Sequence, residues 1–586
     1  MQCTIKLIHI NSITLQIVNT MLQIENLEFS YHKKGNPIFN GINLTIQPGS
    51  VYGLLGKNGI GKSTLLYMMC GLMFPHKGSI RFDGIEVKRR LPETLEKIFL
   101  VPEEFDLPSI SIDDYVRRNS VFYPNFNIDQ FNQYLSDFEL ENTKNLAKTS
   151  MGQKKKYLVS FALATNTPLL LMDEPTNGMD IPSKSQFRKV IASGMNEQKS
   201  IVISTHQVRD LENMIDHITI LDNGLLLLDA DTHTISSRLR FIKGGNESEI
   251  AGAFYKVSTI AGYSAILPNE TDEESLIDIE MLFNCTIGDP EVIPPQNNTN
   301  MKETDIIDPV RIGKFSLGYF RWSVTAHIFQ PKRFWKYCTK QVYEWKRGLS
   351  LQFISLTGIY TLLMFIFHTD GQPFITSSGA QMLIWLGFFI YIAKSSSSLA
   401  DQIGIRSKRV VYLTVPVSTA EKYIAHLLST IVLYPLLFFA AIVVAQYASE
   451  LISSTIRGEI FNPGTPLQGC FSMWKNSGFT TIFFVTSVLS TIATFTLGAT
   501  LWQKNSFLKT VSALFLFSIV FSFSCSLFLT NEEIGSAVSY LFIGKFFDNS
   551  SNFFWLINTV QIAETIILGY IGYLRLKELE INETKR

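Results

Sequence analysis

Charged residues are scarce in this chain, and neither sign is in excess. Asp, Glu, Lys and Arg make up 17% of its 586 residues, and 51 basic residues balance 51 acidic ones. Nucleic-acid-binding proteins carry a basic surface, so the composition predicts no nucleic-acid partner. The chain is also longer than the roughly 250–300 residues at which one hydrophobic core stops growing, so we expect several domains.

Cysteine is equally scarce and shows no paired spacing. The chain has 6 cysteines, with no C-x-x-C motif: Cys3, Cys70, Cys285, Cys338, Cys470 and Cys525. This pattern excludes a short disulfide framework and predicts free thiols.

The first residues do not show the pattern of a cleavable signal peptide. Residues 1–20 mix polar and apolar side chains, without a long apolar core or a small-residue cleavage site. We expect a leader or extension without defined structure; an amphipathic membrane anchor is the less favoured alternative. The first strand-like pattern starts after Met21.

The most informative stretch is residues 51–66, VYGLLGKNGIGKSTLL. Its part from Gly56 to Ser63 fits G-x-x-x-x-G-K-[ST], the phosphate-binding loop, between an apolar strand and a helix. Glycines let several backbone N–H groups face a phosphate, Lys62 would reach the β- and γ-phosphates, and Ser63 would ligate Mg²⁺. A mere glycine-rich turn is the alternative, but it leaves Lys62 and Ser63 unexplained.

Two further apolar runs end in polar side chains. Residues 169–172 precede Asp173 and Glu174, and residues 201–204 precede Thr205 and His206. Ligands of open α/β sheets bind at the carboxyl ends of strands, so these side chains are candidates for metal and water activation. Taken singly, Glu174 would be a solvated strand-end acid and His206 a core histidine.

Two weaker signals accompany these strands. Residues 149–153 precede an expected helix, whose N-terminal amides would bind an anion. Tyr31, ahead of the loop, would stack on adenine or be a half-buried strand residue. We interpret Lys154 to Lys156 as a solvated helix face rather than a second phosphate site.

Together these motifs resemble the ATPase domain of ABC transporters over residues 21–235. The resemblance implies an α/β P-loop NTPase domain that uses ATP and Mg²⁺. It implies catalytic roles for Glu174 (general base), His206 (switch histidine) and Lys62, and metal contacts for Ser63, Asp173 and Glu103. The implied nucleotide contacts are Tyr31, Gly56, Asn58, Gly59, Gly61, Lys62, Ser63, Thr64, Ser150, Gly152, Gln153 and Asp180.

The chain departs from the family pattern at two positions. Glu103 stands where the family has a glutamine that senses Mg²⁺ and couples to the membrane domain, and Met151 stands where the signature usually has glycine. A carboxylate still binds Mg²⁺ or its waters, so we expect altered coupling rather than loss of activity.

The segment after the ATPase pattern divides into three. Asp222-Asn223-Gly224 predicts a hairpin. Residues 236–284 predict a small C-terminal extension of the ATPase, and the Pro- and Asn-rich residues 285–312 predict a linker.

Residues 313–586 predict an all-α, polytopic membrane domain. Apolar stretches long enough for about six spans lie near residues 349–367, 376–393, 425–446, 480–502, 507–529 and 553–574. The second stretch is short, so five spans remain an alternative. Lys and Arg gather in alternate connections, which places both ends of this domain in the cytoplasm.

Polar residues recur inside two of the predicted spans. Ser490, Thr494 and Gly498 form a small-residue face suited to close packing. Glu564 is a functional candidate because it lies within a span, or else a structural hydrogen-bonding group. The connection 395–422 is the expected contact with the ATPase.

The second half also resembles, in architecture, the six-helix permeases of bacterial exporters of drugs, lipids, polysaccharides or peptides. That resemblance implies a half-transporter in the bacterial cytoplasmic membrane. Its expected partners are the lipid bilayer, a second copy of the chain and a small-molecule, lipid or peptide substrate. An importer and a mechanotransmitting ATPase remain alternatives, while the spans exclude a soluble translation factor.

Overall fold

The computed structural model describes residues 20–32, 35–208, 214–260, 262–270, 275–288, 329–366, 378–458, 481–529 and 550–580. Residues 1–19 of the expected leader (1–20) and residues 289–312 of the expected linker (285–312) lie outside these ranges. The chain divides into two compact units, which are described separately: one holds Met1–Glu104 and Ser111–Lys314, and the other holds Phe105–Ile110 and Phe315–Arg586.

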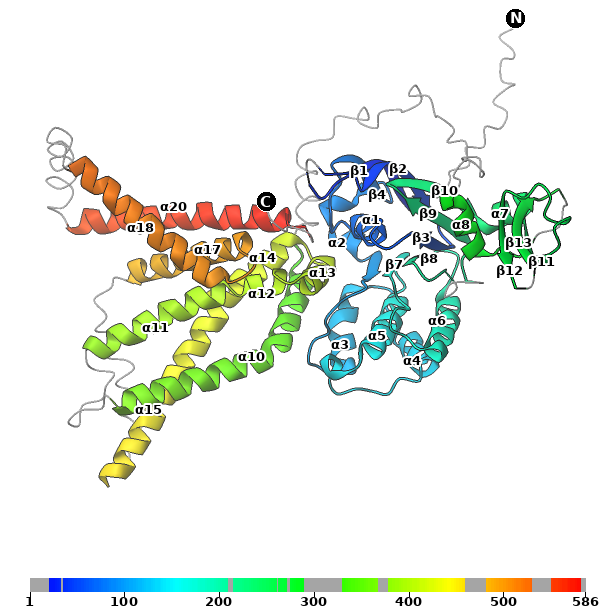
Figure 1. Cartoon of the computed structure of the whole chain (residues 1–586). Coiled ribbons are helices and arrows are strands. Elements are labelled where there is room, and N and C mark those ends of the chain that lie inside the picture. The colour runs from blue at the N-terminus through cyan, green and yellow to red at the C-terminus, as the bar shows by residue number, and fades with distance from the viewer. Residues whose placement is uncertain are drawn as a thin grey trace, which may run out of the picture. The chain divides into compact units, whose positions relative to one another are not determined.

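A six-stranded sheet forms the centre of the first unit, in the order β10-β9-β3-β8-β7-β6 (Figure 1). Neighbours from β9 to β6 are parallel, and only β10 is antiparallel. The strands are β3 (Val51–Leu55), β6 (Ile98–Val101), β7 (Leu169–Asp173), β8 (Ser200–Thr205), β9 (His217–Asp222) and β10 (Leu225–Asp231). Every residue of β3, β7 and β8 is buried, as expected for parallel strands covered on both faces.

Helices of this unit pack on the sheet and on one another. Helix α1 (Lys62–Met69) contacts β7, and α5 (Met151–Ala164) contacts β6, α4 and α6. Among the described residues up to 238, the other α-helices are α2 (Pro92–Leu95), α3 (Ile112–Asn119), α4 (Ile128–Asp137), α6 (Ile181–Gly194) and α7 (Thr232–Arg238). Short 3-10 turns are η1 (Val87–Arg89), η2 (Ser120–Phe122) and η3 (Leu146–Lys148).

A second, antiparallel sheet has the order β2-β1-β4-β5. Its strands are β1 (Leu22–Phe29), β2 (Phe39–Ile46), β4 (Lys77–Phe82) and β5 (Ile85–Glu86). Leu22, Ile24, Leu27 and Phe29 of β1 are buried, so the apolar pattern seen in the sequence marks the core face of this strand.

The predicted hairpin is present. Asn223 and Gly224 both have positive φ, 46° and 78°, as a type I′ turn between β9 and β10 requires. Beyond it, β11 (Leu239–Gly245), β12 (Tyr255–Thr259) and β13 (Gly262–Pro268) form a separate sheet. The expectation that a linker begins at residue 285 is wrong, because α8 (Ile279–Gly288) continues past it and buries Cys285.

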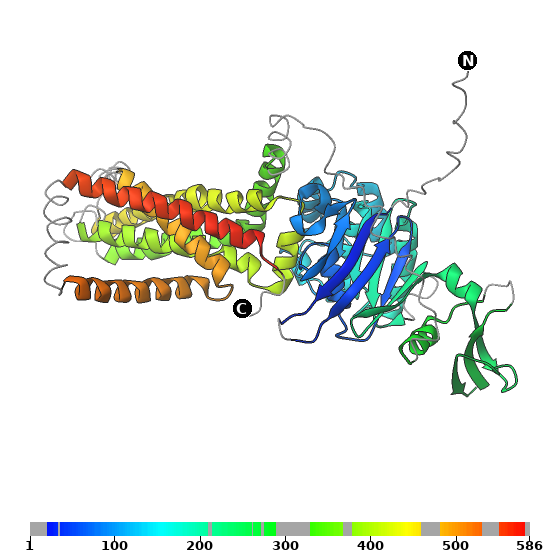
Figure 2. The ribbon, with the colours of Figure 1, turned by 90° about the horizontal axis from the view of Figure 1, so that it is seen from above.

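The second unit is helical, and Figure 2 shows its long helices running roughly alongside one another. They are α10 (Pro331–Ile366), α11 (Ser378–Ser396), α14 (Thr419–Leu428), α15 (Tyr434–Arg457), α17 (Thr481–Leu501), α18 (Ser506–Leu529) and α20 (Ser550–Lys577). Within the described residues, 5 helices are long and apolar enough to cross a membrane: Pro331–Ile366, Gln381–Ile403, Thr419–Arg457, Thr481–Leu501 and Ser506–Phe523. The sixth predicted span forms α20, which is not among these five.

The third span is longer than predicted and contains an irregular turn. Helices α14 and α15 are joined by η8 (Ser429–Leu433), a π-helical segment, into one stretch of 39 residues. Pro435, at the start of α15, has no N–H to donate to a carbonyl oxygen of the preceding helical turn. Its ring therefore accounts for the break in regular α-helical hydrogen bonding.

The connection at residues 395–422 is helical rather than a loop. It contains α12 (Leu399–Ile403), α13 (Arg406–Thr414) and the first turn of α14. Glu421 at that turn is buried, and its carboxylate accepts from Arg333 Nε at 2.9 Å and from the Gln330 N–H at 2.8 Å. This ion pair fixes the start of α10 against α14.

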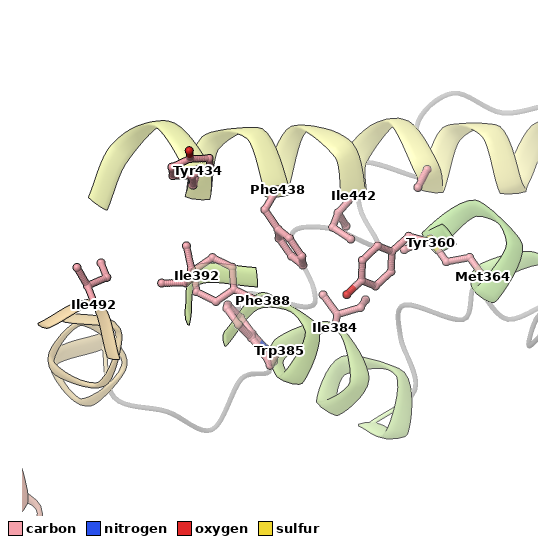
Figure 3. Packing of buried hydrophobic residues seen from close by; sticks show 11 residues of the cluster. Tyr360, Met364, Ile384, Trp385, Phe388, Ile392, Tyr434, Phe438, Ile442 and Ile492 are labelled. Atoms are coloured by element: carbon pink, nitrogen blue, oxygen red, sulfur yellow. The ribbon is translucent and has the colours of Figure 1, made fainter. Parts of the chain in front are cut away.

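An aromatic cluster packs α10, α11 and α15 together (Figure 3). Phe438 of α15 lies 5.6 Å from Tyr360 of α10 and 5.3 Å from Phe388 of α11, measured between ring centroids. Both pairs are edge-to-face, the arrangement that aromatic quadrupoles favour. These spans are therefore joined by aromatic packing.

Polar side chains join α17 to α20. Glu564 Oε2 accepts from Ser490 Oγ at 2.8 Å, and its Oε1 from Thr494 Oγ1 at 3.4 Å. Gly498 lies against Thr510 of α18, where a Cβ would stand 2.0 Å from the Thr510 hydroxyl. The predicted small-residue face is thus confirmed as a packing face.

Candidate functional site

The phosphate-binding loop lies between β3 and α1, as its sequence predicts. Gly59 and Gly61 have φ of 82° and 114°, values that a side chain disfavours. A Cβ at Gly56 would stand 2.7 Å from the Leu221 carbonyl oxygen, so that position also needs glycine. Gly61 is the N-cap of α1 and offers no side chain to cap it, which leaves the first N–H groups of the helix available for an anion.

Lys62 folds back onto this loop. Its Nζ donates to the carbonyl oxygens of Gly56 at 2.8 Å and Lys57 at 3.2 Å, and lies 3.8 Å from Glu174 Oε1. Burial lowers the pKa of Lys62, and the charges of Glu174, Asp173 and Glu103 oppose that shift. The ammonium group therefore stands between the loop and the carboxylates, where a phosphate would require a cation.

Asp173, at the end of β7, accepts three side-chain hydrogen bonds. Its Oδ1 accepts from Ser63 Oγ at 2.9 Å and Ser204 Oγ at 2.6 Å, and its Oδ2 from Tyr67 OH at 3.3 Å. Burial raises the pKa of Asp173, and the bonds from Ser204 and Ser63 lower it. The predicted metal contacts Ser63 and Asp173 thus lie together.

Glu174 follows directly and faces His206. The Glu174 Oε1 atom lies 2.8 Å from His206 Nδ1, and Oε2 accepts from Thr205 Oγ1 at 3.3 Å. Both partners come from the end of β8, which pairs in parallel with β7 through Asp173 and Ser204. The parallel register therefore explains how residues distant in sequence form one acid–histidine pair.

The sequence interpretation missed several residues of this site. Ser204 and Tyr67 hold Asp173, and Lys155 Nζ donates to the carbonyl oxygens of Glu174 and Asn177 at 2.8 and 2.9 Å. The interpretation of Lys154 to Lys156 as a solvated face is wrong for Lys155, which is 2% exposed. Tyr67 stands one helical turn after Ser63 on α1, a spacing that would have indicated it.

The signature residues lie at the N-terminus of α5. Ser150 and Gln153 form a capping box, in which Ser150 Oγ accepts from the Gln153 N–H at 3.3 Å and Gln153 Oε1 from the Ser150 N–H at 3.2 Å. A Cβ on Gly152 would meet the Gly178 carbonyl oxygen at 3.4 Å. Ser150, Met151 and Gln153 are exposed, so this end of the helix faces outward within the unit.

The remaining predicted residues surround the loop less tightly. Tyr31 is 46% exposed and its hydroxyl contacts Thr64 Oγ1, while Asn58 is exposed at the loop tip. Asp180 caps α6, and its bonds from Ser183 lower its pKa.

Glu103 is bound by a neutral partner. Its Oε1 accepts from Asn177 Nδ2 at 3.1 Å. Among the described residues there is no group of three or more His, Cys, Asp or Glu side chains that would hold a metal ion alone. A hydroxyl, one carboxylate and phosphate oxygens suit Mg²⁺, which keeps waters and few protein ligands.

These features define a P-loop ATPase site: a glycine cradle with a lysine, a hydroxyl beside a carboxylate, and an acid–histidine pair. The residues fit ATP with Mg²⁺, since the uncapped helix start, Lys62 and the Ser63–Asp173 pair supply an anion site next to a cation site.

Comparison with known proteins identifies the family. Residues 39–177 match the family model described as "ABC transporter". The chain is 31% identical over 215 residues to the ABC transporter ATP-binding protein YtrB of Bacillus subtilis, covering 36% of this chain and 72% of that protein. It is 33% identical over 220 residues to the lantibiotic transport ATP-binding protein SrtF of Streptococcus pyogenes, covering 36% and 91%.

The chain is also similar to a solved structure described as the ATP binding subunit of an ABC transporter, with 23% sequence identity and a TM-score of 0.34. The match covers 36% of this chain and 90% of the chain in that structure. The chain belongs to the ABC transporter family, and its ATPase domain implies ATP hydrolysis.

Proposed function

We propose that the chain is an exporter half-transporter, with its ATPase and its permease in one polypeptide, that works as a homodimer. The observation that carries the proposal is the acid–histidine pair beside the phosphate loop in a chain whose described residues include 5 helices long and apolar enough to cross a membrane. In domain terms, residues 21–235 are the ATPase, 236–288 its extension, in which α8 ends at Gly288, 289–312 the linker and 313–586 the permease, with α20 as the sixth span.

Each side chain of the ATP site has a proposed task. Lys62 and the N–H groups of the loop would bind the β- and γ-phosphates, and Ser63 and Asp173 would hold Mg²⁺, with Glu103 nearby. Glu174 accepts a proton from the attacking water, and His206 holds the carboxylate in place through the 2.8 Å contact. Tyr31 stacks on adenine beside Thr64.

The proposal of a dimer comes from the signature residues. In the family, the signature binds the ATP held by the opposite subunit, and Ser150, Gly152 and Gln153 occupy those positions. This chain has one phosphate loop and one signature, so each ATP needs a second copy. Asp180 would lie near the same dimer interface.

The direction of transport is proposed from relatives. Their printed names refer to lantibiotic transport, Nod factor export and linearmycin resistance. We infer export of an amphipathic small molecule, lipid or peptide across a bacterial cytoplasmic membrane. An importer and a mechanotransmitting ATPase that moves no cargo are the competing functions.

The test is cargo flux in sealed inside-out vesicles that contain the purified chain. Labelled lipids, amphipathic drugs and peptides are added outside the vesicles with ATP. Uptake by the unsubstituted chain is compared with uptake by Glu174→Gln and by a control, Glu28→Gln, at a carboxylate side chain that is 41% exposed. ATP-dependent uptake that only Glu174→Gln abolishes supports export. ATP hydrolysis without flux for any cargo class favours mechanotransmission, and ATP-driven release from preloaded vesicles of this orientation favours import.

A further inference from the structure

Lys155 is a buried cation outside the phosphate loop. It lies on the second turn of α5 and is 2% exposed. Removing an ammonium group from water is unfavourable unless hydrogen bonds replace the lost hydration, so its partners indicate why it is there.

Both partners that its ammonium group contacts are main-chain carbonyls of one turn. Nζ donates to Glu174 O at 2.8 Å and to Asn177 O at 2.9 Å. The Glu174 carboxylate is bound instead by His206 and Thr205. Lys155 therefore holds the backbone that carries the carboxylate, without pairing with the carboxylate itself.

The Glu174 backbone is held from two sides. Its N–H donates to the Ser204 carbonyl oxygen at 3.1 Å, while its own carbonyl accepts from Lys155. Glu174 has φ of 45°, a left-handed conformation that residues with a Cβ disfavour. Such a conformation persists where surrounding contacts impose it, and here β8 and α5 supply those contacts.

The same turn also binds Glu103. Asn177 accepts from Lys155 through its carbonyl and donates to Glu103 Oε1 through its side chain at 3.1 Å. The signature helix, the Glu174 turn and Glu103 are thus joined within one unit.

We propose that Lys155 is a positioning residue for ATP hydrolysis, which transmits the position of the signature helix to Glu174. Ser150 and Gly152 lie at the start of the helix that carries Lys155, so a displacement of that end by a bound phosphate moves the Glu174 carbonyl with it. The inference rests on the proposed role of Glu174 as general base. In the proposed dimer, it connects contact with one ATP to hydrolysis of the other.

The test compares Lys155→Met and Lys155→Arg in the full chain in lipid nanodiscs. Lys154→Met is the matched control, because it removes a neighbouring lysine of α5 that is not buried. Steady-state hydrolysis gives kcat and KM, and a fluorescent ATP analogue gives the binding constant. A small displacement of a catalytic group costs up to about 100-fold in rate, so we expect kcat of Lys155→Met to fall roughly 10- to 100-fold with analogue binding changed less than about 2-fold.

Lys155→Arg keeps a donor and should recover most of kcat, and Lys154→Met should match the unsubstituted chain. Lys155→Met combined with Glu174→Gln should hydrolyse ATP no more slowly than Glu174→Gln alone, since one substitution acts through the other. Unchanged kcat in Lys155→Met, parallel loss of kcat and analogue binding, or additive losses in the double variant would each overturn the proposal.

If Lys155→Met does not fold, Lys155→Gln, which keeps a polar group on a shorter side chain, replaces it in the same comparison with and without Glu174→Gln. Full activity of Glu174→Gln alone would instead refute the proposed role of Glu174, a failure distinct from that of the inference about Lys155.

Discussion

The imidazole of His206 lies 2.8 Å from the Glu174 carboxylate, Nδ1 to Oε1, at the end of two adjacent parallel strands. If Glu174 is the base, a histidine that orients it should contribute to the rate and little to nucleotide binding. We expect His206→Ala to lower kcat by about 100-fold, the low end of general-base contributions, and to leave the ATP-analogue binding constant within about 2-fold. Stopped-flow binding and steady-state hydrolysis measure the two quantities.

The control for this prediction is Gln207→Ala, whose side chain accepts from Lys184 and does not contact Glu174. Equal kcat in His206→Ala and Gln207→Ala would show that the histidine contact is not used in hydrolysis.

The Ser63–Asp173 contact predicts a dependence on Mg²⁺. Ser63 Oγ donates to Asp173 Oδ1 at 2.9 Å, and both are proposed to hold the ion. Ser63→Ala should raise the Mg²⁺ concentration for half-maximal hydrolysis by about 10-fold, since one oxygen ligand is lost. Tyr67→Phe removes a 3.3 Å bond to the same carboxylate but no oxygen ligand of the ion, so it should change that Mg²⁺ concentration less than about 2-fold. Titration of hydrolysis with Mg²⁺ at fixed ATP tests both, and equal responses would contradict the assignment.

The burial of Lys199 predicts that the free energy of unfolding rises with pH. Its buried Nζ donates to Leu163 O, Asn166 Oδ1 and Gly194 O, and burial lowers its pKa from 10.5 to about 8. Between those values the unfolded chain binds more protons than the folded one, so the free energy of unfolding increases as pH rises from about 8 towards 10.5. At about 1.4 kcal/mol per pKa unit, the gain approaches about 3 kcal/mol.

The measurement uses the buried thiol of Cys70 as the probe, because that thiol is 3% exposed in the same unit. Alkylation pulses in urea, read by peptide mass spectrometry, give the unfolding midpoint at each pH. Lys199→Met should be less stable and should lack this rise. The same pH dependence in Lys199→Met would assign it to other groups.

Glu564 is expected to serve packing between α17 and α20. Its oxygens accept from Ser490 and Thr494 at 2.8 and 3.4 Å. A glutamine would keep one accepting oxygen and could donate from its Nε2 to the other hydroxyl. Glu564→Gln should keep the thermal midpoint and hydrolysis, whereas Glu564→Leu should lose about 1 kcal/mol of stability, the scale of hydrogen bonds between membrane helices. The control is Ile566→Ala, at a side chain 66% exposed. A stable Glu564→Gln that loses cargo-stimulated hydrolysis would instead indicate a functional carboxylate.

The sequence predicted those parts of the fold that local patterns determine. The phosphate loop was predictable because its glycines and Lys62 occupy fixed positions between a buried strand and a helix. Asn223-Gly224 was predictable because few residues adopt positive φ in succession. The spans were located by apolar length, although not their ends, since α10 and α14 continue into polar sequence.

The remaining features depend on contacts between distant segments. Lys155 resembles its solvated neighbours in sequence, and only the packing of α5 against the Glu174 turn buries it. The helices of the connection 395–422 were not predicted, and the buried ion pair at its end, between Glu421 and Arg333, joins segments that are far apart in the sequence. The roles of Glu103 and Met151 stay predictions.

The most direct test of the account is ATP hydrolysis by the purified chain in lipid nanodiscs, with particle mass recorded on the same sample. We predict hydrolysis in particles that contain two copies, lowered by about 100-fold or more by Lys62→Ala and by Glu174→Gln and unchanged in Lys77→Ala, whose side chain is 73% exposed. Hydrolysis by particles with one copy, or an undiminished rate in both Lys62→Ala and Glu174→Gln, would contradict the proposed homodimeric motor.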